Sequence, residues 1–228
     1  MAGQKHDPSM SYSPAEAIQL QQELRSQVRI EHLDERNIHL IGGVDVGFQG
    51  GGTLARAAVV ILEYPSLRRA GQAVAEVQAT FPYIPGLLAF REIPAILAAL
   101  EQLDGLPDVF MVDGQGLAHP RRIGIACHLG VVIDRPSLGC AKSLLVGKFG
   151  ALPETAGSVS DLLDRGEVVG RVVRTRQGVK PVFVSVGHRI DLDGAVRLVM
   201  ACTTRYRLPE PTRLAHRLAS RKMGKDRQ

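Results

Sequence analysis

The hydrophobic pattern of the chain consists of short apolar runs separated by glycine, proline and charged residues. Such runs, bounded by turn formers, are typical of strands that are covered on both faces of a sheet. The clearest run, residues 109–112, is followed at once by Asp113 and Gly114. Because open sheets bind ligands at the carboxyl ends of their strands, Asp113 is the first candidate functional residue. The alternative is that Asp113 and Gly114 form only a turn.

Further apolar runs predict the rest of the sheet. Three runs with short connections predict an antiparallel meander over residues 40–48, 57–62 and 73–79. The first of them carries Asp45 where a core residue is expected, so this acid needs a specific reason to be there. Later runs predict a short buried strand that ends in Lys142 and a second pair of strands, at 137–142, 168–173 and 182–186.

Helical signals lie between these runs. Ser13, Pro14 and Glu16 form a capping signature, and apolar residues continue at helical spacing to about Ile30. Other helices are predicted over residues 95–100, 123–133, 191–202 and from 209 through 216. The helix at 95–100 crosses over to the strand at 109–112, which makes that strand parallel to a neighbour. The pattern predicts an α/β fold in which helices cover both faces of a central mixed sheet.

The composition agrees with a folded protein. Of 228 residues, 45% are hydrophobic and 22% charged, which is an ordinary globular balance. We expect one domain over residues 1–228, with flexible tails at about 1–12 and 221–228. No apolar run approaches the roughly 20 residues needed to span a bilayer, and the N-terminal segment lacks a signal-type core. Three widely spaced cysteines predict reduced core thiols, and we expect a cytoplasmic monomer that does not bind membranes.

Basic residues give the chain a formal net charge of +5 and gather around a few loops and the C-terminal tail. This balance favours a polyanionic partner such as nucleic acid, although charge runs are more often solvated faces.

Three carboxylates suggest where the chemistry takes place. Asp45 and Asp113 lie on apolar strands, and Glu92 lies just before the helix at 95–100. Burying one such group without compensation costs several kcal/mol. Carboxylates with water are the ligands that magnesium and manganese prefer, so the pattern indicates a metal-dependent nuclease. Each acid also has a structural alternative: an arginine ion pair for Asp45, a cap at Pro94 for Glu92, and a turn for Asp113.

The segment at residues 81–86 contains two prolines and an exposed aromatic position. Proline fixes a backbone dihedral and removes a hydrogen-bond donor, which predicts a stiff loop outside regular structure. Tyr83 on such a loop can stack where an extruded base leaves a gap.

Several of these stretches together carry a family resemblance. The chain resembles endonuclease V, a deoxyinosine-directed nuclease family with a ribonuclease H-like fold. The resemblance covers roughly residues 15 to 218, in order and with similar spacing. Its matching stretches are 43–48, 82–92, 112–122, 139–142, 186–189 and 206–213.

The resemblance implies roles for five residues. Asp45 and Asp113 are expected to bind a catalytic Mg²⁺, for which Mn²⁺ can substitute, and Glu92 completes the acidic site. His216 falls where the family has a histidine or an acid close to the metal and the attacking water. Lys142 matches a family lysine near the scissile phosphate, where it would offset growing negative charge. The implied reaction cuts the second phosphodiester bond 3′ to the deaminated adenine and leaves 3′-hydroxyl and 5′-phosphate ends.

A second group of residues is expected to contact the nucleic acid. The wedge, Pro82, Tyr83, Ile84 and Pro85, would fill the gap left by a flipped base. Backbone amides at Gly86, Gly114 and Gly116 could read hypoxanthine, because glycine lets a base approach the main chain. His119 is a candidate lining residue, and Arg121 could hold a phosphate. Gln115 stands where many family members have histidine, which bears on base recognition rather than on the metal ligands.

Three other interpretations remain open. The chain could be a ribonuclease H-like, structure-selective nuclease without base specificity, or an endoribonuclease that acts on inosine in RNA. It could also be a nucleic-acid-binding module that has lost its chemistry. The presence of Asp45, Glu92, Asp113 and Lys142 together argues against the last interpretation.

Overall fold

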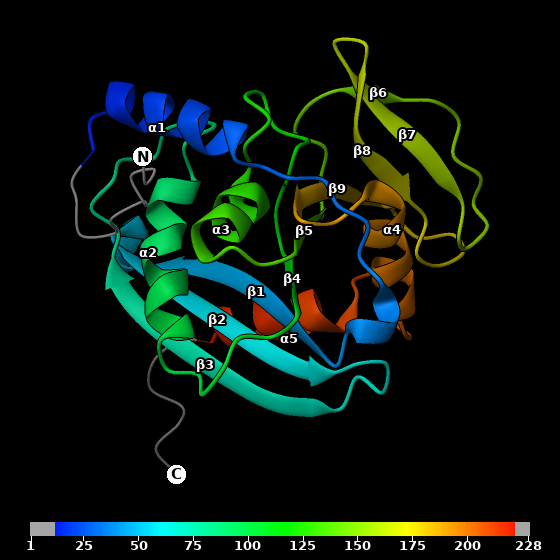
Figure 1. Ribbon diagram of the computed structural model, residues 1–228, viewed down its shortest axis with the longest axis horizontal. Coiled ribbons are helices and arrows are strands. Elements are labelled where there is room, and N and C mark those ends of the chain that lie inside the picture. Colours follow the sequence, from blue (N-terminus) through cyan, green and yellow to red (C-terminus); the bar gives the residue numbers. More distant parts are fainter. Residues whose placement is uncertain (1–11, 222–228) are drawn as a thin grey trace.

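The computed structural model describes residues 12–221, so the expected tails fall largely outside the described residues. Within that range, nine strands form one mixed sheet in the order β3-β2-β1-β4-β5-β9-β8-β7-β6 (Figure 1). The strands are β1 (Leu40–Gln49), β2 (Leu54–Glu63), β3 (Arg69–Gln78), β4 (Val109–Val112), β5 (Ser137–Ala141), β6 (Lys148–Phe149), β7 (Val159–Asp164), β8 (Glu167–Val173) and β9 (Val182–His188).

The pairing confirms the expected meander and crossover. Strands β1, β2 and β3 are antiparallel neighbours, while β4 is parallel to both β1 and β5. In the β1–β4 register, Val44 pairs with Val112. The acids that directly follow these two positions, Asp45 and Asp113, therefore come to the same place at the end of β4.

In the described part of the chain, five α-helices pack around the sheet, and two single-turn 3₁₀ helices lie at Glu35–Asn37 and Gly50–Gly52. The α-helices are α1 (Pro14–Ser26), α2 (Ala89–Leu100), α3 (Ile125–Ile133), α4 (Leu192–Ala201) and α5 (Glu210–Ala219). Apolar residues of α2 and α3 share one core with β1 to β4, and those of α4 and α5 share a second core with β1 and β9. Figure 1 shows α2 in front of β1 and β2 and α5 behind them. Helices therefore cover both faces, as predicted.

The largest differences from the sequence prediction concern two helix boundaries and two strands. Helix α1 ends at Ser26 rather than near Ile30, because the Arg29 amide donates to the side chain of His188, the last residue of β9, and its carbonyl oxygen accepts from the amide of Arg189. Helix α2 begins at Ala89, six residues earlier than expected, and Pro94 lies inside it. The short strands β6 and β7 were not predicted.

The cysteine prediction is confirmed in part, since Cys127, Cys140 and Cys202 are buried and unpaired. None of the helices in the described part of the chain is long and apolar enough to cross a membrane.

Candidate active site

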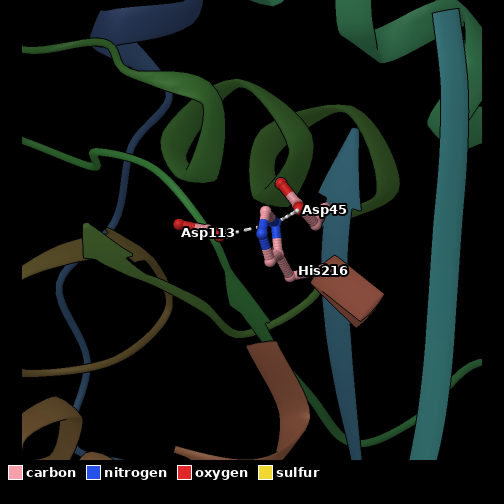
Figure 2. A group of neighbouring side chains, drawn as sticks. All are labelled: Asp45, Asp113 and His216. Atoms are coloured by element: carbon pink, nitrogen blue, oxygen red, sulfur yellow. Dashed lines mark hydrogen bonds and ion pairs between the residues drawn. The ribbon is translucent and has the colours of Figure 1, made fainter. Parts of the chain in front are cut away.

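The central group of the candidate site consists of Asp45, Asp113 and His216 (Figure 2). Asp45 lies in the middle of β1 and Asp113 directly follows β4, with side chains that are only 12% and 8% exposed. His216 reaches them from α5: its Nδ1 lies 2.6 Å from Asp45 Oδ2 and 4.0 Å from Asp113 Oδ2. Three elements that are distant in sequence thus contribute to one polar group.

Two glycines explain why α5 lies close enough to β1 for this contact. A Cβ atom at Gly43 would be 2.0 Å from the carbonyl oxygen of Pro211, at the start of α5. A Cβ atom at Gly47 would be 3.0 Å from the carbonyl oxygen of Ala219, at its end. Helix α5 therefore runs along β1 at a separation that only glycine permits at Gly43, and His216 is carried to the acids.

Lys142 follows β5 and places its ammonium group between the acid and the histidine. Its Nζ forms an ion pair with Asp113 Oδ2 and lies 3.2 Å from His216 Nδ1. No hydrogen bond of good geometry from the described residues reaches the buried Oδ2 atom of Asp113. The arginine partner considered for Asp45 is absent from the ion pairs of the described residues, where His216 takes that place.

Glu92 lies in the first turn of α2, where it is half-buried beside the two aspartates. The capping alternative for it is wrong, because the N-cap of α2 is Leu88 and Glu92 is inside the helix. Burial, together with the charges of Asp45 and Asp113, raises the pKa of Glu92 to about 8. Burial and the charge of Asp113 likewise raise the pKa of Asp45 to about 6. The protein thus gathers negative charge that its own residues neutralise only partly.

A divalent cation fits this donor set. One ligand atom from each of Asp45, Asp113 and His216 can be chosen so that all lie within 4.8 Å of one another. Carboxylate oxygens suit magnesium or manganese, and an imidazole nitrogen is a common ligand of transition-metal ions. The poorly satisfied oxygen of Asp113 and the raised pKa values of Asp45 and Glu92 fit a group of carboxylates that binds a cation. Glu92 lies outside the three-residue group, so its part as a direct ligand has weaker geometric support.

A cavity of about 380 Å³ opens directly beside the acids. Glu92, Asp113 and Lys142 form one end of its wall, and the wedge segment forms another. Three wedge-segment residues, Tyr83, Ile84 and Pro85, line this cavity together with Gly86. Tyr83 is 70% exposed, in agreement with the expected protruding aromatic, and Pro82 lines a neighbouring groove that Tyr83 and Glu92 also line.

Gly86 and His119 form a further part of the cavity wall. Gly86 has φ +80°, and its carbonyl oxygen accepts hydrogen bonds from Gln21 at 2.9 Å and from Arg121 at 2.6 Å. The guanidinium of Arg121 also donates to the Gln21 side chain, so it braces the wall from within the protein. Burial and the nearby charge of Arg121 lower the pKa of His119 to about 4, which leaves this ring neutral at physiological pH.

The other two glycine positions differ from each other. Gly114 lines the cavity, but its amide donates to Val112 at 2.9 Å. Gly116 is not among the lining residues: its amide donates to Ser185, and a Cβ there would lie 2.0 Å from the carbonyl oxygen of Val186. Close packing of the main chain is thus sufficient reason for glycine at 116.

Gln115 supports the loop after β5. Its Nε2 donates to the carbonyl oxygen of Ser143 at 3.0 Å, while its buried Oε1 lines the cavity region without a hydrogen-bond partner among the described residues. One end of the amide is therefore structural, and the other has no hydrogen-bond partner among the described residues.

Sequence reasoning missed several lining residues. Leu144 and Leu145 line the cavity although they are exposed, and an exposed apolar pair directly after Lys142 was the signal for them. Gln21 was the other omission. It shares the buried face of α1 with Ala17 and Leu24, and a polar side chain among apolar ones was the signal that this position has a specific role. Arg122, which follows Arg121, pairs with Asp164 and Glu167.

Comparisons with known proteins agree with this geometry. The family model described as Endonuclease V matches residues 22–217. An endonuclease V of Nostoc punctiforme is 53% identical over 207 residues, which cover 91% of this chain and 94% of that protein. The crystal structure of endonuclease V from Streptomyces avermitilis has 42% identity and a TM-score of 0.89, and the match covers 93% of this chain and 94% of that one.

A further structure shows a relative with nucleic acid. Ciona intestinalis endonuclease V, in complex with a 24mer DNA containing an inosine followed by a ribo-adenosine, is 31% identical with a TM-score of 0.79. That match covers 90% of this chain and 95% of the other. The expected ribonuclease H-like α/β fold is confirmed by these neighbours. Since the family model and the relatives each cover most of the chain, this protein belongs to the endonuclease V family of nucleases.

Proposed function

We propose that the protein is a Mg²⁺-dependent endonuclease that recognises inosine in nucleic acid and cuts the second phosphodiester bond on its 3′ side. The products would carry 3′-hydroxyl and 5′-phosphate ends, and Mn²⁺ would substitute for Mg²⁺. The observation that carries the proposal is the shared wall of the cavity: Asp113 and Lys142 line it at one end, and Tyr83, Gly86 and His119 line it elsewhere. A base held in this cavity would leave the following backbone beside the acids.

The residues would divide the chemistry among them. Asp45 and Asp113 would hold the cation, with Glu92 completing the acidic group and His216 beside them. When bound, the cation lowers the pKa of a coordinated water and offsets charge on the scissile phosphate. The ammonium group of Lys142 would move from its ion pair with Asp113 to the phosphate oxygens, whose negative charge grows during the reaction. Attack by water requires no covalent enzyme intermediate.

Recognition would combine extrusion with a neutral pocket. Pro82, Tyr83, Ile84 and Pro85 would occupy the space that the flipped base leaves, at a cost of a few kcal/mol that is lowest for a weak pair. His119 is neutral in the wall, so it can donate one hydrogen bond and accept another. Gly86 and Gly114 leave room for a base at the main chain, and Gln115 Oε1 can accept a hydrogen bond. We further propose that the enzyme acts as a cytoplasmic monomer.

The test maps the products of strands that differ only in one base. One inosine or one adenosine is placed in DNA and in RNA, single- and double-stranded, and each strand is incubated with Mg²⁺, with Mn²⁺ or with EDTA. We expect one cut at the second 3′ bond of the inosine strands with either metal and none with EDTA. The RNA arm decides between DNA and RNA as the better substrate. Cutting that ignores inosine would favour a structure-selective nuclease, and cutting that survives EDTA would refute the metal site.

A further inference from the structure

Helix α1 carries one polar side chain that is almost completely buried. Gln21 is 1% exposed and lies on the same face as the core residues Ala17, Leu20 and Leu24. A buried amide is unfavourable unless its donor and acceptor are both satisfied, and an apolar residue would fit this face with less constraint. The position therefore requires a reason beyond helix packing.

Both ends of the Gln21 amide contact residues that shape the cavity. Its Nε2 donates to the carbonyl oxygen of Gly86 at 2.9 Å, and its Oε1 accepts from Arg121 Nε at 2.5 Å. A second guanidinium nitrogen of Arg121 donates to the same Gly86 carbonyl at 2.6 Å. The three residues form a closed triangle that joins α1, the end of the wedge segment and the loop after β4.

The triangle determines where the cavity wall lies. A Cβ atom at Gly86 would be only 2.8 Å from the Arg121 guanidinium, so that group fills the space behind the glycine. The backbone amide of Arg121 lies 3.3 Å from Nδ1 of His119 and donates to it. A change in the position of Arg121 would therefore shift both Gly86 and His119, which line the cavity.

We propose that Gln21 is a positioning residue for base selection: by holding Arg121 and the Gly86 carbonyl, it keeps the cavity wall in the shape that distinguishes inosine from adenosine. This inference rests on the proposed function. Gln21 need not touch the base, and its influence passes through Gly86 and His119. An amide suits the task because it accepts from a guanidinium and donates to a carbonyl at the same time.

Two substitutions separate the contacts. Gln21→Met is similar in size and removes both hydrogen bonds, whereas Gln21→Glu keeps an acceptor for Arg121 and loses the donor to Gly86. Gln22→Met is the matched control, because Gln22 is the next residue on the same helix and is exposed. For each protein, kcat/KM is measured on an inosine strand and on the matched adenosine strand. Their ratio does not depend on how much of the protein is folded.

We expect Gln21→Met to lower the inosine preference, which is the ratio of the two kcat/KM values, by about 10-fold. Small displacements of the groups that position a substrate change rates by factors of this order or more. Gln21→Glu should retain more of the preference than Gln21→Met, and Gln22→Met should equal the native protein. A native ratio in Gln21→Met, with only a lower melting temperature, would overturn the inference and leave Gln21 as a folding residue. Equal cleavage of both strands by the native protein would instead refute the proposed function itself.

A second, independent feature lies on the other side of α5. Three arginines, Arg69, Arg217 and Arg221, line a hollow of about 90 Å³ between α5 and the strands β2 and β3. No carboxylate lines this hollow, and none of the three arginines forms an ion pair with a described residue. Arg69 donates only to the side chain of Gln72, at 3.1 Å.

The position of the hollow relates it to the acidic site. His216 contacts the acids, and the next residue of the same helix, Arg217, lines the hollow. The C-terminal end of α5 favours nearby cations, but this does not explain Arg69, which comes from β3. Like charges around one hollow repel one another unless an anion offsets them, and guanidinium groups match phosphate geometry.

We infer that this hollow binds a backbone phosphate of the nucleic acid after the strand has crossed α5. The test uses the double variant Arg69→Gln/Arg217→Gln and the control Arg135→Gln, an exposed arginine just before the central strand β5. Affinity for inosine and inosine-free strands is measured over a range of salt concentrations.

We expect the double variant to bind both strands more weakly by the same factor and to lower the slope of log Kd against log salt by about 1. The control should match the native protein. An unchanged slope would overturn the inference. Inorganic phosphate is titrated as a second probe. If the double variant binds the strands as tightly as the native protein does, but only the native protein binds phosphate, the hollow is a site for free phosphate instead.

Discussion

The acidic group and the wall around Gly86 border one cavity, yet their polar atoms are satisfied in opposite ways. In the acidic group, carboxylates face one another, and the pKa values of Asp45 and Glu92 are raised by desolvation and by the charges of the neighbouring aspartates. Around Gly86, by contrast, Gln21 and Arg121 satisfy the carbonyl oxygen completely from inside the protein. The first region is built to be completed by a cation, and the second to keep its shape before any ligand arrives. Chemistry and recognition should therefore respond to different substitutions.

The largest expected effect is the loss of cleavage in Asp113→Asn. The amide keeps the size of the side chain but weakens the cation site and the ion pair with Lys142. We expect a single-turnover rate lower by on the order of 10³-fold or more, the scale on which removal of one stabilising group acts. Affinity for the inosine strand, measured in EDTA, should change little. A variant that cleaves within tenfold of the native rate would remove Asp113 from the cation site.

The next effect concerns stability without metal. Glu92 has an ordinary pKa of 4.5 and a folded value of about 8, so the folded protein keeps a proton that the unfolded chain releases. Its contribution to stability is present below pH 4.5 and is lost as the pH rises to about 8. In EDTA, we expect Glu92→Gln to exceed the native protein in free energy of unfolding by a few kcal/mol near pH 8. The two proteins should be equally stable near pH 4.

Urea unfolding at several pH values measures this difference. Asp45 acts in the same direction over a lower range, from its ordinary value of 3.8 to about 6. Saturating Mg²⁺ should reduce the advantage of Glu92→Gln, because the cation stabilises the charged acids. A difference that does not vary with pH would contradict the charge balance assigned to the acidic group.

The sequence allowed accurate prediction where local pattern and burial agree. The run at 109–112 is β4 at the same bounds, and Asp191 caps α4 through the amide of Gly194, as expected. Strands β6 and β7 were missed because their residues are largely exposed and lack a clear alternation. Helix α2 was begun too late because proline usually ends a helix, whereas packing of Phe90 and Ile93 in the cores outweighs that preference here.

The candidate site was predictable to a different extent in its two regions. Buried acids are costly, so Asp45 and Asp113 could be identified from strand pattern alone, and the structure brings them together. The cavity wall depends on hydrogen bonds between residues far apart in the chain, such as Gln21 and Gly86. Nothing local shows that Gly116 is needed for packing or that Arg121 is held internally. These facts follow only from tertiary structure.

A smaller effect is expected for Tyr83→Ala, which tests the wedge. Stacking of a base on an aromatic side chain contributes about 1–3 kcal/mol, so kcat/KM on double-stranded inosine substrate should fall by about 10- to 100-fold. The fall should be smaller on single strands, where no gap has to be filled. Competition assays with both substrates measure the difference. Equal losses on the two substrates would argue that Tyr83 acts on binding in general.

The smallest effect concerns His119, whose titration has the opposite sign to that of Glu92. Its pKa falls from 6.5 to about 4 in the folded protein, so stability is retained above pH 6.5 and lost as the pH falls towards 4. Between pH 7.5 and pH 5.5, the free energy of unfolding of the native protein should fall by roughly 1 kcal/mol more than that of His119→Gln. Unfolding of both proteins at these two pH values measures the change. A constant difference would mean that His119 is not held neutral.

The most direct test of this division of labour compares Asp45→Asn with Gln21→Met on the same pair of inosine and adenosine strands. For each variant, the single-turnover rate with Mg²⁺ and the ratio of the two dissociation constants in EDTA are measured. The account predicts that Asp45→Asn loses cleavage but keeps the native ratio of dissociation constants. Gln21→Met should keep metal-dependent cleavage but show a smaller preference for the inosine strand in that ratio. The account would be contradicted if both substitutions altered the same quantity.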